Sequence, residues 1–181
     1  MIFQNKKFSI LFIFMVMFLF NSSRLDAVIL HSEKIKKYEV TVQINKNGTL
    51  TVNEVIDYQF GEEFKHGIYR DIPLRSKRFG FDVHKSFIKM NWIKRDGEDE
   101  EYTKNHFYEG IRYRIGSETE LVNLYKTESR YELNYDIYNA VFEKDGIYQV
   151  YYNAIGQFWN VPVERASVII RFPDGQKIKK K

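Results

Sequence analysis

The chain has 181 residues, of which 44% are hydrophobic and 29% are charged, with a formal net charge of +4 and no cysteine. The absence of cysteine excludes disulfides, thiolate catalysis and cysteine metal sites. Much of the small basic excess lies in the last residues, so the composition indicates no nucleic-acid partner.

The N-terminus has the layout of a secretory signal peptide. Lys6 and Lys7 precede a thirteen-residue hydrophobic stretch, residues 8–20, and polar residues follow it. A bilayer span needs about 20 apolar residues, so this stretch suits a signal-peptide core. We predict a signal peptide or signal anchor over residues 1–27, with cleavage after Ser23 or Ala27 and retention as an anchor both open. The rest of the chain is then exported, either to the extracytoplasmic side of the cell membrane or into the medium.

The first structural signal after the leader is a hairpin. Tyr38, Val40, Val42 and Ile44 alternate with polar residues, which is typical of a half-buried strand. Asn47-Gly48 follows, a dipeptide that favours a tight hairpin turn because both residues accept positive φ. Residues 50–60 alternate again, so we predict an antiparallel hairpin over residues 36–60.

The next segment, residues 61–79, breaks the alternation. It contains the motif Gly67-Ile68-Tyr69-Arg70-Asp71-Ile72-Pro73. Gly67 permits a backbone turn, and Pro73 cannot donate a hydrogen bond to an interior ladder. We therefore predict a long crossing connection or an irregular edge strand.

The remainder repeats strand and turn signals. Turn dipeptides occur at Asp96-Gly97, Asp145-Gly146 and Asp174-Gly175. The segments between them are rich in Tyr, Ile, Val and Phe, which favour strands. These segments are residues 82–94, 101–108, 110–115, 130–138, 146–154 and 166–172. Residues 118–125 fit a loop or one helical turn.

These elements predict an all-β fold. About 7–9 strands joined by short turns favour an antiparallel β-sandwich, immunoglobulin-like in architecture, behind the N-terminal signal peptide. We assign residues 28–175 to this domain. We expect residues 176–181 to be a basic tail, either truncated before a membrane segment or the end of a stand-alone exported protein.

Glu54 is the carboxylate that stands out. Strict alternation places it on the same face as Val52 and Ile56, which we expect to be the core face. A buried carboxylate is costly unless it is paired, and Arg70 is a candidate partner. The alternative is a bulge near Asn53 that turns Glu54 outward. If the pair exists, we expect a structural ion pair, with a catalytic acid as the less favoured role.

No other motif in the sequence indicates a catalytic or metal-binding site. The histidines lack metal-ligand spacing, no G-x-S-x-G motif occurs, and the acidic run at residues 96–101 lacks calcium-loop spacing. We therefore predict no catalytic residue, no metal and no cofactor. Aromatic residues are abundant, and one group could stack on sugars, although core packing is the favoured explanation. This group is Tyr148, Tyr151, Tyr152, Phe158 and Trp159.

Four segments together resemble a known family. Residues 148–163, YQVYYNAIGQFWNVPV, are similar to the strand and turn that end the domain called DUF2207, found in predicted bacterial and archaeal membrane proteins. Residues 47–54 resemble the first hairpin of that domain, residues 67–73 its G-hYRxIP segment, and Arg114-Ile115-Gly116 its rIG step. The positions that carry the resemblance are Glu54, Gly67, Tyr69, Arg70, Asp71, Pro73, Gly116, Gly156, Trp159 and Pro162.

The resemblance implies a signal peptide, an exported β-sandwich and membrane helices beyond it, but it implies no activity. Within the last segment, Gly156 would let the chain bend, Pro162 would start the approach to the last strand, and Trp159 should be largely buried.

Three functions remain open. The favoured one is a non-enzymatic extracytoplasmic module that contacts a protein or cell-envelope partner through strand edges or the loop at residues 61–79. The second is a carbohydrate-binding domain, and the third is a glycosidase-like enzyme that uses Glu54 with Asp57 or Asp71. Membrane association is expected, and no nucleic acid is.

Overall fold

The computed structural model describes residues 32–78, 82–144 and 147–173. These residues contain strands, turns and loops and no helix, which confirms the all-β prediction. The described residues from Glu33 onward belong to one compact unit. The predicted signal peptide, the Asp145-Gly146 and Asp174-Gly175 turns and the basic tail lie outside the described residues.

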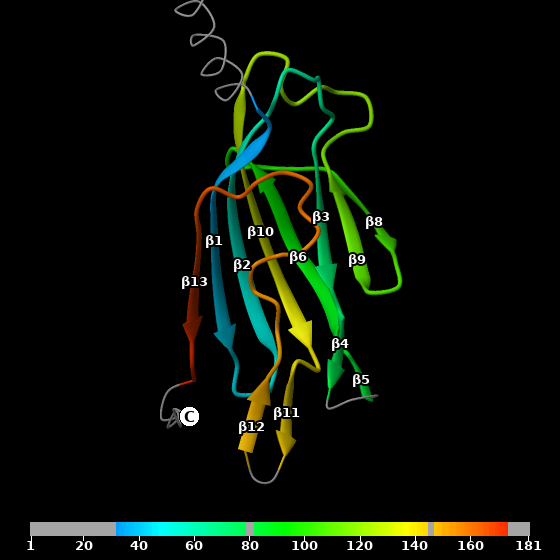
Figure 1. Ribbon diagram of the computed structural model, residues 1–181, viewed down its shortest axis with the longest axis vertical. Coiled ribbons are helices and arrows are strands. Elements are labelled where there is room, and N and C mark those ends of the chain that lie inside the picture. The colour runs from blue at the N-terminus through cyan, green and yellow to red at the C-terminus, as the bar shows by residue number, and fades with distance from the viewer. Residues whose placement is uncertain (1–31, 79–81, 145–146, 174–181) are drawn as a thin grey trace, which may run out of the picture. The chain divides into compact units, whose positions relative to one another are not determined.

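The larger sheet has six strands in the order β13-β1-β2-β10-β6-β7 (Figure 1). The predicted hairpin of residues 36–60 is confirmed as β1–β2, and Gly48 takes a φ of +80° in its turn. The strands are β1 (Lys34–Ile44), β2 (Leu50–Gln59), β6 (Phe87–Arg95), β7 (Glu98–Asp99), β10 (Glu128–Tyr138) and β13 (Ala166–Arg171).

The smaller sheet has three strands in the order β3-β9-β8. They are β3 (Ile68–Pro73), β8 (Tyr102–His106) and β9 (Gly110–Ile115). The segment predicted as a crossing connection or edge strand therefore contains a regular edge strand, which ends at Pro73. Two separate hairpins complete the fold: β4 (Arg75–Arg78) with β5 (Asp82–Lys85), and β11 (Val141–Lys144) with β12 (Ile147–Val150).

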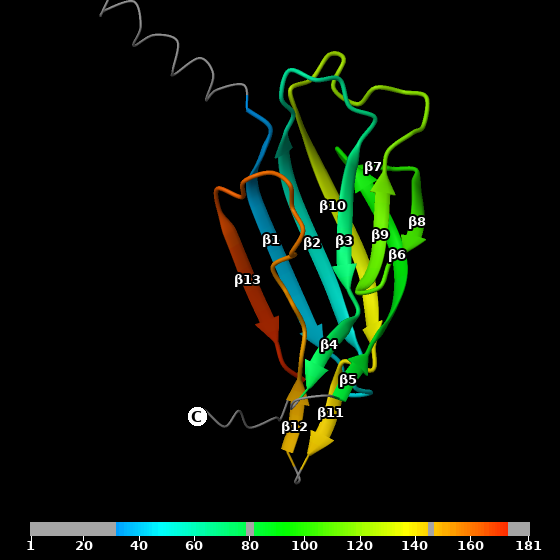
Figure 2. The same ribbon diagram turned by 45° about the vertical axis from the view of Figure 1, so that its right-hand side comes forward.

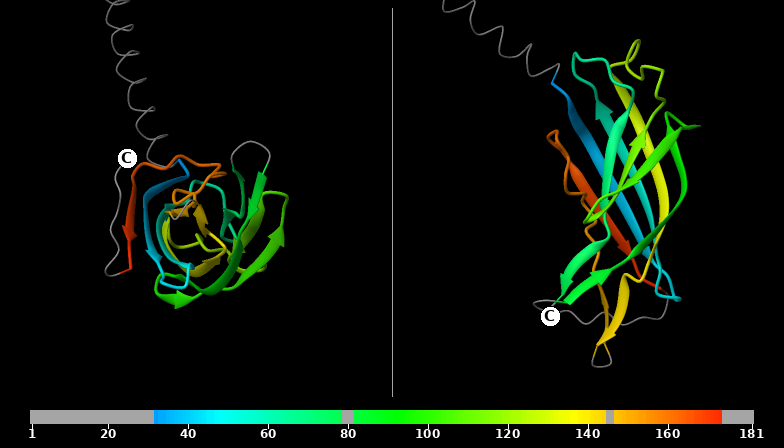
Figure 3. Two further views of the ribbon diagram at one scale, coloured as in Figure 1. Left: turned by 90° about the horizontal axis from the view of Figure 1, so that it is seen from below. Right: turned by 90° about the vertical axis from the view of Figure 1, so that its right-hand side faces the viewer.

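The two larger sheets share one hydrophobic core. Apolar side chains of β1, β2 and β10 pack with those of β3 and β9, because each of these strands turns alternate residues inward. Figures 2 and 3 show the smaller sheet and the segment at residues 151–165 on the same side of the larger sheet. The immunoglobulin-like sandwich architecture stays a prediction.

Several details of the predicted topology were wrong. The described residues form thirteen strands, more than the 7–9 expected, partly because residues 82–94 split at Ser86 into β5 and β6. The sheet is not purely antiparallel, since β13 runs parallel to β1. The reason is that β12 ends at Val150, short of the predicted residue 154, and residues 151–165 then run back along the sheet before β13 begins. Residues 118–125 are a loop.

Candidate functional site

A buried ion pair lies at the centre of the core. Glu54 on β2 and Arg70 on β3 have side-chain exposures of 0% and 1%. The Arg70 Nε donates to Glu54 Oε2 over 2.7 Å and its Nη2 to Oε1 over 2.6 Å. The predicted pairing is therefore confirmed. The alternative bulge near Asn53 is not formed, because β1 and β2 stay in register from Asn53 through Glu54.

Two tyrosines complete the hydrogen bonds of this pair. Tyr135 on β10 donates its hydroxyl to Glu54 Oε1 over 2.5 Å, and the Tyr152 hydroxyl lies 2.6 Å from that of Tyr135. Arg70 Nη1 donates to the carbonyl oxygen of Asp71. We call Glu54, Arg70, Tyr135 and Tyr152 the polar centre.

The segment after β12 covers the polar centre. The guanidinium of Arg70 lies 5.8 Å from the ring centroid of Tyr38 and 5.6 Å from that of Trp159, a distance at which a cation is attracted to an aromatic ring. A Cβ on Gly156 would lie 2.5 Å from Arg70 Nη1. Gly156 thus lets the chain lie close to Arg70, and its predicted role in a bend stays a prediction.

Trp159, which was predicted to be largely buried, packs against the core with its indole nitrogen shielded from solvent and the rest of its side chain partly exposed. It packs edge-on against Tyr38, with 5.9 Å between ring centroids. Pro162 does begin the approach to the last strands, since its carbonyl accepts a hydrogen bond from Ile35 N at the start of the parallel pairing.

The remaining motif positions surround the polar centre. Asp71 is buried and forms two 2.7 Å hydrogen bonds with Arg112 on β9, whose guanidinium lies 5.4 Å from the centroid of the exposed Tyr69 ring. Gly67 and Gly116 face each other across β3 and β9, where a Cβ on either would lie within 2.0 Å of a backbone oxygen. Pro73 ends β3 opposite Gly110.

The electrostatics of the polar centre favour fixed protonation states. Burial alone would lower the pKa of Arg70, but the Glu54 carboxylate holds that pKa well above its usual value. Burial, and then the charge of Glu54, raise the pKa values of Tyr38 and Tyr135 well above the usual value. Arg70 therefore keeps its charge and the phenols beside it stay neutral, an arrangement suited to fixing the geometry of the core.

The three carboxylates considered for catalysis do not meet. Asp57 lies on the opposite face of β2 from Glu54, where it pairs with Arg130, and Asp71 pairs with Arg112. The hydrogen bonds from Arg130 have the largest effect on Asp57 and lower its pKa, whereas burial acts in the opposite direction. All three acids are thus engaged in separate ion pairs.

The aromatic group proposed for sugar stacking is also divided. Tyr152 turns into the polar centre and Trp159 packs on Tyr38, whereas Tyr148 and Tyr151 are exposed. Sequence reasoning missed Tyr38 and Tyr135. Strand alternation places both tyrosines on the core face. Because a buried tyrosine hydroxyl usually has a hydrogen-bond partner, this alternation could have predicted that both side chains lie near a polar group in the core.

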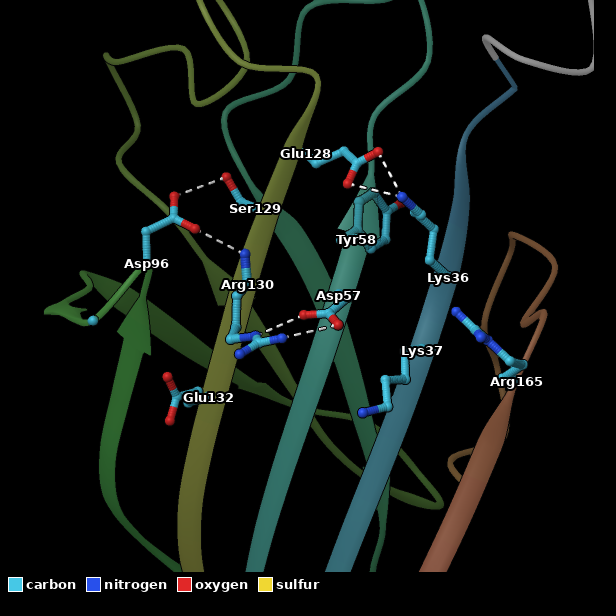
Figure 4. A pocket seen from close by; sticks show the side chains of 11 residues that line it. Lys36, Lys37, Asp57, Tyr58, Asp96, Glu128, Ser129, Arg130, Glu132 and Arg165 are labelled. Carbon is cyan, nitrogen blue, oxygen red and sulfur yellow. Dashed lines mark hydrogen bonds and ion pairs between the residues drawn. The ribbon is translucent and has the colours of Figure 1, made fainter.

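The outer face of β1, β2 and β10 carries a shallow depression with a volume of about 660 Å³ (Figure 4). Its charges are largely neutralised, because Arg130 pairs with Asp57 and Lys36 with Glu128. Among the described residues no group of three or more histidine and carboxylate side chains could hold a metal ion.

A second feature is an apolar surface at one end of the domain, formed by residues 61–67 and 117–127, which we call the loop tip. Hydrogen bonds join its two loops, from Lys65 N to Asn123 Oδ1 (2.8 Å), from Asn123 Nδ2 to Glu63 O (2.9 Å) and from Val122 N to Lys65 O (2.8 Å). Four apolar side chains remain exposed there: Phe64 (62%), Leu121 (37%), Leu124 (47%) and Tyr125 (94%).

Carboxylates surround these apolar side chains. Exposed acidic residues flank both loops at Glu62, Glu63, Glu118 and Glu120. Glu63 pairs with Lys65 and Glu118 with Arg114. Within the described part of the chain, Glu62 and Glu120 have no ion-pair partner. The loop tip is thus apolar at its centre and acidic at its rim.

Comparisons with known proteins identify the family of the chain, whereas the solved structures that it resembles are only distantly similar. The family of predicted membrane proteins called DUF2207, N-terminal domain, matches residues 34–180. No curated protein matches the chain. In the described residues we find no helix long and apolar enough to cross a membrane.

The solved structures are remote. Leukotriene A4 hydrolase of Saccharomyces cerevisiae is 6% identical, with a TM-score of 0.41, over 57% of this chain and 15% of that one. An M1 zinc metallopeptidase of Deinococcus radiodurans is 9% identical, with a TM-score of 0.41, over 59% of this chain and 20% of that one. The chain thus spans a small part of these enzymes, and the likeness carries no argument about activity.

Proposed function

Because the chain belongs to DUF2207, the N-terminal domain of predicted membrane proteins, we propose that it is a non-enzymatic extracytoplasmic domain that holds a protein partner at the cell envelope. The signal-peptide layout of residues 1–27 supports export. The two sheets around one core support the sandwich architecture predicted from the sequence.

The interior supports binding over catalysis. Both oxygens of Glu54 accept hydrogen bonds from Arg70 or Tyr135, and the pair is shielded from solvent. A general acid needs access to the substrate atom that it protonates, and this shielded carboxylate has no such access. We therefore assign Glu54 a structural role.

The loop tip carries the proposal. Exposed apolar groups rimmed by polar residues are typical of protein-interaction sites. The hydrogen bonds through Asn123 hold both loops in place, so a partner meets an ordered surface. Ordered surfaces bind with a smaller entropic cost than flexible ones.

The rim indicates the chemistry of the partner. Glu62 and Glu120 carry exposed charges without an ion-pair partner among the described residues. A complementary surface presents apolar side chains flanked by Lys or Arg, because matched charges speed association and exclude wrong partners. We propose a partner segment of this kind.

Crosslinking in cells tests the proposal. The full chain, its Tyr125→Ser variant and its Glu120→Lys variant are crosslinked in intact cells, purified through an affinity tag and compared for the partner that each retains. We expect both variants to reduce recovery of one defined partner by about tenfold, the effect of losing one interface anchor. Tyr148→Ser on β12 is the matched control, because Tyr148 is 73% exposed away from both loops.

An unchanged partner in all four proteins would overturn the loop tip as the contact. Equal loss in the Tyr148→Ser control would also overturn it, since the contact would then not be local. Membrane association is measured separately, by alkaline extraction and the intact mass of the native protein. A full-length protein found entirely in the cytoplasmic fraction, with none in the membranes that are subjected to alkaline extraction, would contradict the proposed location.

A further inference from the structure

The outer face of the large sheet carries an ordered row of amide side chains. Cross-strand pairing aligns Thr41, Asn53, Asn134 and Trp92 on β1, β2, β10 and β6. Thr41, Asn53 and Asn134 lie on the face opposite the core, because their strand neighbours are buried. Trp92 is paired with Asn134 and is exposed, next to the buried Ile93. With strands spaced about 4.8 Å apart, the row spans roughly 14 Å.

Hydrogen bonds fix the amides relative to one another. Asn134 Nδ2 donates to Asn53 Oδ1 over 2.6 Å, and Asn91 Nδ2 donates to Asn134 Oδ1 over 2.8 Å. Asp136 accepts from Asn91 (3.2 Å) and from Thr51 Oγ1 (2.7 Å). We call the three side chains Asn53, Asn91 and Asn134 the amide row.

The amide row keeps unused hydrogen-bonding groups. In the part of the chain that the structure describes, Asn53 Nδ2 and Asn91 Oδ1 have no partner, so the row ends in a free donor and a free acceptor. Each amide can make up to four hydrogen bonds. A ligand that offers both donors and acceptors, as sugar hydroxyls do, would satisfy these groups without rearranging the side chains.

Exposed aromatic residues flank the amide row on β6 and β10. Trp92 is 37% exposed beside Asn134, and Phe87 (55%) and Tyr138 (40%) pair at the other end of the same two strands. Lys94 and Lys85 approach Trp92 and Phe87 at 5.8 Å and 5.6 Å from the ring centroids. Aromatic rings with an apolar body at a wet surface are suited to the apolar faces of sugar rings.

The charges on this face indicate a neutral ligand. The row of Thr41, Asn53, Asn134 and Trp92 is uncharged. The neighbouring rows carry both signs, with Glu132 opposite Lys94 and Asp136 opposite Lys89. A polyanion would meet as many carboxylates as amines, so its charge would bring no net attraction.

We infer that this face binds a neutral glycan chain, which lies across β2, β10 and β6 with its hydroxyl groups on the amide row and a sugar ring against Trp92. The site is remote in sequence from the loop tip and does not depend on the partner proposed above. It also differs from the aromatic group around residues 148–159, which the fold divides.

An array of neutral oligosaccharides of glucose, N-acetylglucosamine, mannose and xylose tests the inference, with heparin as the polyanionic comparison. The full chain is purified in mild detergent with its Trp92→Ala, Asn134→Ala and Tyr125→Ala variants. We expect a neutral glycan to bind the native chain and the Tyr125→Ala control equally, and Trp92→Ala and Asn134→Ala to weaken binding about tenfold, which corresponds to one lost contact of about 1.4 kcal/mol.

Binding to no neutral glycan, binding to heparin alone, or equal binding by the Trp92→Ala and Asn134→Ala variants would each overturn the inference. If these variants lose their thermal transition, NMR of the native chain decides the question. A bound glycan should shift the indole signal of Trp92 and leave that of Trp159, inside the domain, in place. The reverse pattern, or no shift, would contradict the site.

Discussion

Arg70 donates two hydrogen bonds to Glu54 in an interior shielded from water, and Tyr135 donates a third. At such a site the cost of removing water from two charges is offset only if every polar atom is paired. The strand alternation and the need for a cation made this pair predictable. The contribution of Tyr135 was not, because the pairing of β10 with β2 is set by long-range register.

The two core tyrosines of β10 give a matched comparison. Tyr135→Phe removes a hydrogen bond to a charged group and should lower the free energy of unfolding by about 1.5–3 kcal/mol. Tyr131→Phe should change it by less than about 0.5 kcal/mol or raise it, because among the described residues the buried Tyr131 hydroxyl has no hydrogen-bond partner. Urea denaturation of both variants measures the difference. Equal losses would show that the hydroxyl of Tyr135 is not a specific ligand of Glu54.

The ion pair itself is tested by a double-mutant cycle. Glu54→Gln or Arg70→Met alone leaves one buried charge unpaired and should cost about 3–5 kcal/mol. The double variant should cost clearly less than the sum, because it leaves neither charge behind. Chemical denaturation of the four proteins gives the coupling energy. Additive losses would refute the pair.

At the scale of the elements, the β3–β9 pairing depends on glycines that allow close backbone approach. Gly116 has a φ of +130°, and a Cβ there would lie 2.0 Å from His66 O. Gly67 and Gly116 were expected to matter because they lie in segments that resemble family motifs. The physical reason that glycine is needed at these positions could not be predicted, because the close contact forms only when residues some fifty positions apart pair in the sheet.

Gly116→Ala should therefore destabilise the domain far more than Gly97→Ala. Gly97 also has a positive φ, +91°, but a Cβ there would meet nothing within 4 Å. Backbone strain alone costs about 1–2 kcal/mol, so Gly97→Ala sets the baseline for that effect. Thermal unfolding of the two variants measures the excess that is due to the backbone clash. Similar transition temperatures would mean that β3 and β9 do not approach as described.

Across the whole molecule, local patterns predicted the all-β class and the hairpins that have strong turn residues. They did not predict the parallel β1–β13 pair, because the path of residues 151–165 is set by its packing over Arg70 and Tyr38 and not by its own composition. The loop tip and the amide row could not be predicted from these local patterns either. Both depend on which loops and strands become neighbours.

The buried tyrosines give the whole domain a predictable response to alkali. Burial raises the pKa of Tyr113 to about 12 and, with nearby carboxylates, raises the pKa values of Tyr38, Tyr131 and Tyr135. In the unfolded chain these groups lose their protons near pH 10, as free tyrosine does, whereas the folded state retains them.

The unfolded state therefore binds fewer protons above about pH 10. The contribution of the buried tyrosines to the free energy of unfolding should be constant below that pH and fall steadily above it. Urea denaturation over a pH series, with tyrosinate absorbance as a second signal, measures this. Full ionisation of the tyrosines near pH 10 in a protein that remains folded and equally stable would contradict their burial.

The loop tip is the proposed contact surface of a non-enzymatic envelope domain. A photo-crosslinking amino acid placed at Tyr125 in the full chain, in living cells, tests it most directly, with Tyr148 as the control position. We predict one discrete adduct from position 125, none from position 148, and an attached partner peptide that carries Lys or Arg beside apolar residues. No adduct at position 125, or the same adducts from both positions, would contradict the account.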